Sequence, residues 1–140
     1  MEIRNLRIED YDELCQLWQE LDNITYKKSL DSIQMFAIFL QRNPRLSFGA
    51  WNKNKLIAAV LCGQDGQCGY MNIFFGDIRN PQLEIGKKLV QKTLDRLRQI
   101  GIHKSRIFIP GDDENALKFW NSLGWKEKSP YKVLSKNVTL

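Results

Sequence analysis

The sequence predicts an α+β fold with three layers (α/β/α), in which a mixed sheet of about six to seven strands lies between helices. Apolar residues recur at helical spacing in several separate segments of the chain. Three consecutive runs typical of strands precede the longest of these segments, and further strands alternate with helices after it. A chain of 140 residues, 43% of them hydrophobic, can supply one continuous core, so a single domain over residues 1–140 is expected.

The chain is expected to begin with a strand over residues 2–7, followed by a helix. Glu9 and Asp10 supply an acidic first turn, which the positive end of the helix dipole favours. One face of this helix has apolar side chains at helical spacing: Tyr11, Leu14, Leu17, Trp18 and Leu21. This periodicity predicts a helix that packs one side on the core.

A second apolar helix is expected at about residues 31–42. Ser29 or Asp31 is the expected N-terminal cap, because side-chain oxygens of these types accept bonds from the free amides of a first turn. Asn43-Pro44 ends the helix, because the residue before a proline avoids helical geometry.

Three strands in a meander are expected next, over residues 46–51, 55–63 and 68–76. The connections at 52–54 and 64–67 contain Asn, Asp and Gly, which tolerate the positive φ angles of short hairpins. The three strands are therefore expected to be antiparallel neighbours.

The longest helix is expected from Ile85 to Ile100, because apolar residues recur there at intervals of three and four, and Gly101 suits a left-handed C-terminal cap. A strand over 104–110 follows. Since a helix joins it to the preceding strand, these two strands, the fourth and fifth, are expected to be parallel.

A short helix capped by Asp112 or Asp113 and ended by Gly124 is expected after that strand. A final pair of strands, near 125–128 and 131–138, is expected to close the chain. The complete predicted order is β-α-α-β-β-β-α-β-α-β-β.

Composition limits the kinds of function. No stretch approaches the about 20 apolar residues of a membrane-spanning helix, and the charged N-terminus is unlike a signal peptide, so a cytoplasmic protein without membrane association is expected. The three cysteines, Cys15, Cys62 and Cys68, lack metal-site spacing, so no metal site is expected. The net charge of +5 is spread along the chain rather than gathered in a run, so nucleic acid is not the expected partner.

Two segments resemble the GNAT acetyltransferase superfamily, and the element order resembles it over essentially the whole chain. IGKKLVQKTLDRL at 85–97 is similar to the family's cofactor-binding helix, and NALKFWNSLGW at 115–125 is similar to a later family motif. The hairpin CGQDGQCGY resembles a bacterial branch of predicted N-acetyltransferases. The resemblance implies a GNAT-like sheet and acetyl-CoA as co-substrate, bound where the fourth and fifth strands separate.

The resemblance also implies which residues bind acetyl-CoA. The expected set comprises backbone groups at the end of the fourth strand, the start of the long helix and the later motif: Phe74, Phe75, Gly76, Gln82, Glu84, Ile85, Gly86, Lys87, Asn115 and Trp120. Amides at a helix start favour phosphate. For Asn115 a capping role is the alternative, and for Trp120 the alternative is packing in the core.

The phosphate loop departs from the family pattern, because Pro81 removes a donor and Glu84 replaces a glycine. A carboxylate about 4 Å from a phosphate charge costs roughly 4 kcal/mol at an effective dielectric of 20. Glu84 is therefore expected to point to solvent and to pair with Lys87 or Lys88 if the cofactor binds. The alternative is a helix start without any ligand, where Glu84 only favours the dipole.

The resemblance implies direct attack of an amine on the thioester, with a backbone N–H near residues 74–76 stabilising the carbonyl oxygen. The family's usual acid is a tyrosine, but this chain has Trp120 at that place, so Tyr131 is the candidate acid. Asp77 and Glu114 are the candidate bases, and Asp77, at the end of the fourth strand, is the predicted catalytic base. His103 is expected to lie far from the cleft.

The predicted function is therefore acetyl transfer to an amine of a small molecule or of a protein terminus. One alternative is a GNAT-like binding or regulatory domain with weakened acetyl-CoA binding. The other is a structural or nucleic-acid-associated module that uses the basic surface. Strand edges and aromatic residues in the C-terminal part leave room for a homodimer.

Overall fold

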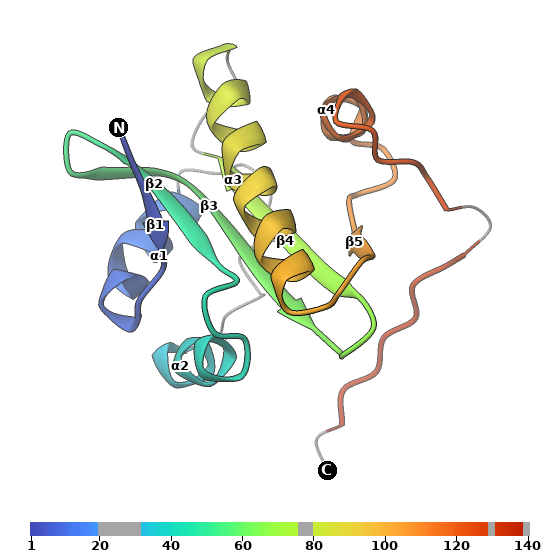
Figure 1. Ribbon diagram of the computed structural model, residues 1–140, viewed down its shortest axis with the longest axis horizontal. Helices are drawn as coiled ribbons and strands as arrows, with labels where there is room; N and C mark the ends of the chain where they lie inside the picture. Colours follow the sequence, from blue (N-terminus) through green and yellow to red (C-terminus); the bar gives the residue numbers. More distant parts are fainter. Residues whose placement is uncertain (20–31, 76–79, 129–130, 139–140) are drawn as a thin grey trace. The chain divides into compact units, whose positions relative to one another are not determined.

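Ten elements follow one another along the chain in a computed structural model that describes residues 1–19, 32–75, 80–128 and 131–138 (Figure 1). Their order and bounds are β1 (Glu2–Asn5), the 3-10 helix η1 (Ile8–Asp10), α1 (Tyr11–Gln19), α2 (Ile33–Arg42), β2 (Phe48–Asn52), β3 (Lys55–Gln64), β4 (Gly69–Phe75), α3 (Asn80–Gln99), β5 (Ser105–Ile107) and α4 (Glu114–Ser122). The chain divides into two compact units, residues 1–108 and 109–140, which are described separately below. A single domain over 1–140 stays a prediction.

The five strands form one sheet in the order β1-β2-β3-β4-β5. Strands β1 to β4 are antiparallel neighbours, and β5 pairs with β4 in parallel. The α+β class, the meander and the parallel fourth and fifth strands are thereby confirmed. Lys53 and Asn54 have φ angles of 51° and 66°, the positive values that a tight β2–β3 hairpin requires.

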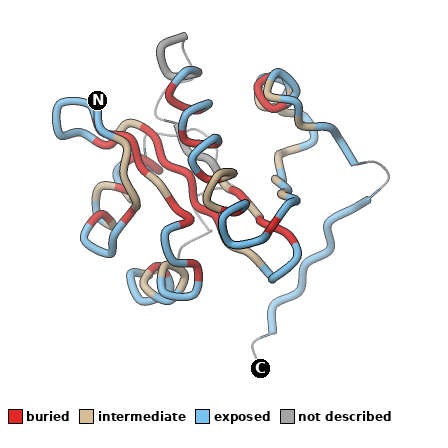
Figure 2. The backbone as a smooth tube through the Cα atoms, viewed as in Figure 1, coloured by how far each residue is buried: buried red, intermediate tan, exposed pale blue. Residues whose placement is uncertain are grey.

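The long strand β3 contains a β-bulge at Ile57. Trp51 pairs with Leu56 but Ala50 pairs with Ala58, so β3 has one extra residue between these two pairs. The extra residue reverses the alternation, and Leu56 therefore lies on the same face as Ala59. Figure 2 shows the burial along β3 that results.

Helices cover both faces of the sheet. On one face, buried residues of α1 and α2, such as Leu14 and Phe36, form a core cluster with Leu61 of β3. On the other face lies α3, because a Cβ at Gly69 of β4 would stand 2.6 Å from Leu97 of that helix. This arrangement confirms the predicted three layers.

Two sets of side-chain contacts stabilise this sheet: one holds β1, and the other joins α2 to β3. The guanidinium of Arg4 donates two hydrogen bonds of 2.9 Å to Asp10 and lies 3.9 Å from the ring centroid of Trp51. Burial opposes ionisation of Asp10, but the hydrogen bonds from the Arg4 side chain and the Arg7 backbone keep the pKa of Asp10 below its usual value. Asn43 ends α2 and joins it to β3, because its amide oxygen accepts a bond from the Gln64 backbone at 3.1 Å.

The N-cap of the second helix lies one residue after Asp31 and three residues after Ser29, the two predicted caps. This N-cap is Ser32, whose hydroxyl accepts a bond from the Met35 amide at 3.1 Å. The predicted caps Ser29 and Asp31, and Leu21 of the first helix, lie outside the described residues. The end of the helix before Pro44 is confirmed.

The long helix α3 was predicted to begin at Ile85, and this was wrong, because the helix begins at Asn80. Pro81 is compatible with this start, since a proline in the first helical turn has a suitable φ and its missing N–H has no partner there in any case. The predicted end is confirmed, because Gly101 has a φ of 88° after the last turn.

In the second unit, α4 is capped by Asp113, whose carboxylate accepts a bond from the Ala116 amide at 3.0 Å. The predicted final strands at 125–128 and 131–138 were wrong: the described residues of this part contain no strand, and residues 131–138 are all exposed (Figure 2). A strand requires a hydrogen-bonded neighbour, which alternation alone cannot provide. The described residues therefore contain five strands rather than the predicted six to seven.

Candidate functional site

The candidate site is the point where the ladder between β4 and β5 ends. The two strands pair at Gly69↔Ser105, Tyr70↔Arg106 and Met71↔Ile107. Beyond Met71, β4 continues to Phe75 and remains paired with β3, but its other edge has no β5 partner. Within the described part of the chain, main-chain groups on that edge therefore have no strand partner and can bind a ligand.

Strand alternation shows which amides face the open edge. The Gly69 amide donates to the Lys104 carbonyl at 2.9 Å, so every second residue from Gly69 onwards directs its N–H toward the β5 side. Ile73 and Phe75 are the residues of that series beyond the ladder. Phe74, one of the predicted carbonyl-binding residues, directs its amide toward Ala59 of β3 instead. Gly76 and Asp77 lie outside the described residues.

The start of α3 holds the residues predicted to bind phosphate. Because the helix begins at Asn80, the amides without helical acceptors belong to its first turn, which includes Gln82 but loses one donor at Pro81. Ile85 and Gly86 are buried and fall in the second turn, where helix carbonyls accept their amides. The segment predicted as a loop is thus helical from Asn80 onwards.

Glu84 and Lys87 lie on the exposed side of α3. The Glu84 side chain is 70% exposed, and its carboxylate lies 3.4 Å from the Lys87 ammonium. This is the solvent-facing pairing that the sequence predicted. Water and Lys87 both reduce the repulsion that the carboxylate would exert on a phosphate at the helix start.

Three predicted site residues belong to the second unit. Asn115 is exposed in the first turn of α4, where Asp113 rather than Asn115 is the cap. Trp120 is 4% exposed and makes edge contacts with the rings of Phe119 and Trp125, at centroid distances of 5.2 and 4.8 Å. Tyr131 is 84% exposed. Within its unit, Trp120 is a packing residue.

Sequence reasoning missed the side chains on the sheet face opposite α3. Because Gly69 faces α3, its neighbour Tyr70 faces the other way, and so does Asn72. Arg106 pairs with Tyr70 in the ladder and therefore shares its face. Phe108 shares it too, because its ring is parallel to that of Tyr70, with centroids 6.3 Å apart. The alternation along 69–75 was the available signal.

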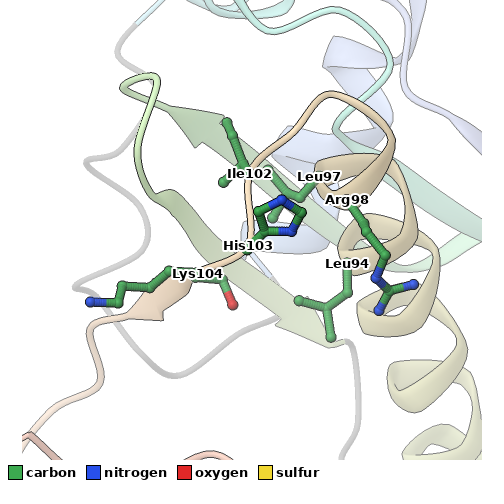
Figure 3. Close-up of a pocket in the computed structure, with 7 residues that line it drawn as sticks. Leu94, Leu97, Arg98, Ile102, His103 and Lys104 are labelled. Carbon is green, nitrogen blue, oxygen red and sulfur yellow. The ribbon is translucent and has the colours of Figure 1, made fainter.

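Elsewhere in the first unit, a shallow depression of about 120 Å³ lies between the last turns of α3 and the start of β5 (Figure 3). Its lining includes Leu94, Leu97, Ile102 and His103. Ligand sites for drug-sized molecules usually have about 300 to 1,000 Å³. The depression lies at the end of the ladder where β5 begins, so His103 lies away from the open edge of β4, as its predicted distance from the cleft requires.

Other chemistry has little support in the described part of the chain. Residues 1–19, 32–75, 80–128 and 131–138 contain no group of three His, Cys, Asp or Glu side chains able to hold a metal ion. Burial raises the pKa of the Cys62 thiol to about 12, so it is protonated and unreactive at neutral pH. No helix in these ranges is both long and apolar enough to cross a membrane.

Sequence comparison gives a family match and a curated relative. The model of the Acetyltransferase (GNAT) family matches residues 8–125. N-alpha-acetyltransferase 30 of Schizosaccharomyces pombe is 27% identical over 118 residues, which are 81% of this chain and 75% of that protein. The family match, over residues 8–125, covers both the open edge of β4 and helix α4.

Solved structures share the fold. PaiA N-acetyltransferase from Thermoplasma acidophilum, in complex with coenzyme A, has a TM-score of 0.76 at 18% identity, covering 93% of this chain and 92% of that one. The ribosomal-protein-S18-alanine N-acetyltransferase of Escherichia coli has a TM-score of 0.71 at 19% identity, covering 91% and 79%. At these identities the likeness concerns the fold.

Proposed function

Because the chain belongs to the GNAT acetyltransferase family, we propose that it is an acetyl-CoA-dependent N-acetyltransferase acting on an amine of a small molecule or a protein terminus. The observation that supports the proposal most is the open edge of β4 from Asn72 to Phe75, beside a ladder that is otherwise paired. An extended thioester arm can lie along such an edge and accept its main-chain hydrogen bonds.

The proposed reaction is direct transfer. The amine nitrogen forms a bond to the acetyl carbonyl carbon, the carbon–sulfur bond breaks, and the proton lost by the amine balances the one gained by the departing thiolate. Negative charge develops on the carbonyl oxygen, where the amides of Ile73 and Phe75 are the proposed donors. A preorganised donor of this kind contributes about 3 to 4 kcal/mol in other enzymes.

The diphosphate of acetyl-CoA is proposed to bind at the start of α3. Gln82 belongs to the first turn, and Lys87, with a side chain 46% exposed, adds positive charge one turn further on. Ile85 and Gly86 support the site by packing, since both are buried. Phe74 also serves indirectly, because its backbone holds β4 to β3.

Asn115, Trp120, Tyr131 and Asp77 keep the roles that the family resemblance implies. We propose Asp77 as the base that takes the amine proton and Tyr131 as the acid that protonates the thiolate. Trp120 cannot donate a suitable proton, so it is proposed to pack against the arm of the cofactor, with Asn115 as a hydrogen-bonding partner.

A wider context belongs to the same proposal. It includes a single domain over 1–140, a cytoplasmic location, no nucleic-acid or membrane partner, and the option of a homodimer. Free thiols at Cys15, Cys62 and Cys68 support a reducing compartment.

A domain with weakened acetyl-CoA binding is the second candidate, favoured by the donor lost at Pro81 and the carboxylate of Glu84. Calorimetric titration with acetyl-CoA separates the two candidates. We expect heat release and a rise in Tm with a Kd below the millimolar range. If millimolar acetyl-CoA produces neither response, acetyl transfer by this chain is excluded and the second candidate remains.

A further inference from the structure

An aromatic and basic surface lies beside the opening between β4 and β5. Tyr70 and Phe108 stack with an angle of 7° between their planes, and Phe108 is 56% exposed. Arg106 pairs with Tyr70 in the ladder and is exposed on the same face. We call these three residues the aromatic–arginine face.

This face adjoins the proposed site of chemistry from the side opposite α3. Tyr70 and Arg106 belong to the ladder pair next to its last one, and Phe108 follows the end of β5. If α3 binds the diphosphate on its own side of the sheet, an amine must approach the thioester carbonyl from the other side. The aromatic–arginine face is therefore on the path of the acceptor.

The two charged side chains near this face, Asp65 and Arg106, differ in whether they have partners. Asp65 is held by the Gln67 and Cys68 amides and by the Tyr70 hydroxyl, which donates to it at 3.1 Å. That hydrogen bond to the carboxylate raises the pKa of Tyr70, so the phenol is neutral at physiological pH. Arg106 has no ion-pair partner among the residues described by the structure.

We propose that the aromatic–arginine face binds the peptide chain that carries the acceptor amine, and that Arg106 selects an acidic residue two or three places after that amine. The inference rests on the proposed function, whose acceptor it narrows to the amino termini of acidic peptides. Ile73 is three residues from Tyr70, or about 10 Å along the strand, a distance that an extended peptide spans in about three residues.

An open face suits a peptide better than a small metabolite. Small molecules are bound in concave sites that bury most of their surface, whereas Phe108 and Arg106 are exposed. The exposed Phe108 ring stacks on the half-buried ring of Tyr70, and aromatic residues with an arginine beside them are typical of the central residues of protein–protein contacts. The rings provide apolar area, and the guanidinium provides the preference for negative charge.

The test uses the full chain, acetyl-CoA and three matched peptides. Each begins with Ala-Ala and continues with Glu-Glu, Gln-Gln or Lys-Lys, so that the variable residues stand two and three places after the residue with the free amine, and all three end in the same neutral tail. We expect kcat/KM for the Glu-Glu peptide to exceed that for Gln-Gln about fivefold, which is the size of one exposed charge pair. The preference should decrease at high salt, because screening weakens the pair.

Variants of Arg106 and Phe108 test which side chain produces the preference for the Glu-Glu peptide. Arg106→Gln should abolish the preference for Glu-Glu, Arg106→Lys should retain it, and Arg106→Glu should favour the Lys-Lys peptide instead. Phe108→Ala should raise KM for all three peptides without changing their order. Lys92→Gln is the matched control, because it removes an exposed positive charge from α3, on the other side of the sheet, and should leave the preference intact.

The outcomes separate this inference from the proposed function. If acetyl-CoA binds but the peptides react equally, or none reacts, the acidic-peptide inference is overturned while the acetyltransferase proposal stands on its own titration. If acetyl-CoA does not bind, the proposed function is overturned, and the inference that rests on it is overturned with it. A preference for Glu-Glu that persists in Arg106→Gln also overturns the role assigned to Arg106.

Discussion

The two edges of the sheet differ in the backbone pairing and side-chain contacts that hold them. At one edge, β1 pairs with β2 from Glu2 to Asn5, and Arg4 ties the strand to Asp10 and Trp51. At the other edge, β5 pairs with β4 for only three residue pairs, and β4 continues beyond them. Both edges belong to the same unit and the same five-stranded sheet.

This difference indicates which edge we expect to affect stability and which edge we expect to affect ligand binding. At the β1 edge the carboxylate of Asp10 is buried and accepts hydrogen bonds from Arg4 and from the Arg7 amide, so this charge is not available to a ligand. The β4 edge keeps main-chain donors free where β5 diverges, and unpaired donors are available for binding. Changes at the first edge should therefore alter folding, and changes near the second should alter ligand binding.

The largest effect is expected from breaking the fastened edge with Asp10→Ala. Asp10 is 4% exposed, and its loss leaves the Arg4 guanidinium without two hydrogen bonds. We expect the free energy of unfolding to decrease by about 3 kcal/mol, the lower end for breaking a buried pair, because Arg4 keeps access to water. Urea denaturation measures it. Asp95→Ala, which removes an exposed pair with Arg98, should cost less than about 1 kcal/mol, and equal losses would refute the comparison.

A smaller loss is expected from Gly69→Ala, at the paired start of β4. The new Cβ would lie 2.6 Å from Leu97, which is 2% exposed and can move little. Overpacking of this kind should lower the free energy of unfolding by about 2 kcal/mol. In the Leu97→Ala background the added methyl should cost less, since space is then available. Gly111→Ala is the control, because its Cβ would meet no atom within 4 Å.

Glu84→Gln tests the open side, through acetyl-CoA affinity rather than stability. Removing the exposed carboxylate near the start of α3 should tighten acetyl-CoA binding by about two- to fivefold at low ionic strength, because one repulsive charge is removed. Calorimetric titration measures the change. Asp95→Asn, toward the other end of the same helix, should have almost no effect. A large loss of affinity in Glu84→Gln would show that the phosphate site has been assigned to the wrong place.

The smallest effect concerns the pH dependence of the fastened edge. The folded state holds the pKa of Asp10 below its usual value, so the unfolded chain binds more protons at acid pH. Stability from Asp10 is therefore fully present above about pH 4 and is lost as the pH falls through the lower folded pKa. Urea midpoints between pH 2 and 6 should show this loss in the native chain and not in Asp10→Asn. Parallel curves would contradict the assignment.

Much of the fold followed from local patterns. The apolar periodicity of α1 and of α3 predicted their buried faces, and Leu14, Leu17, Leu89 and Leu97 are each at most 2% exposed. Turn residues predicted the β2–β3 hairpin, and the crossover helix predicted the parallel β4–β5 pair. These features depend on neighbours in sequence, so a single chain contains the information.

The site was less predictable, because it depends on where pairing stops. The start of α3 was misplaced by several residues, since Pro81 is compatible both with a loop and with a first helical turn. Tyr70 and Arg106 are 36 positions apart in the numbering and meet only through the parallel register. The alternation in 131–138 predicted a strand that has no partner in the described residues.

The sequence by itself determined the α+β class, the three layers and the order of the nine described strands and α-helices, because hydrophobic periodicity and turn chemistry act within short stretches of chain. Tertiary structure alone decided where β4 loses its β5 partner, and hence that the amides of Ile73 and Phe75 rather than that of Phe74 face the opening. Hydrogen-bond register between distant strands sets this choice, and a shift of one residue would reverse it.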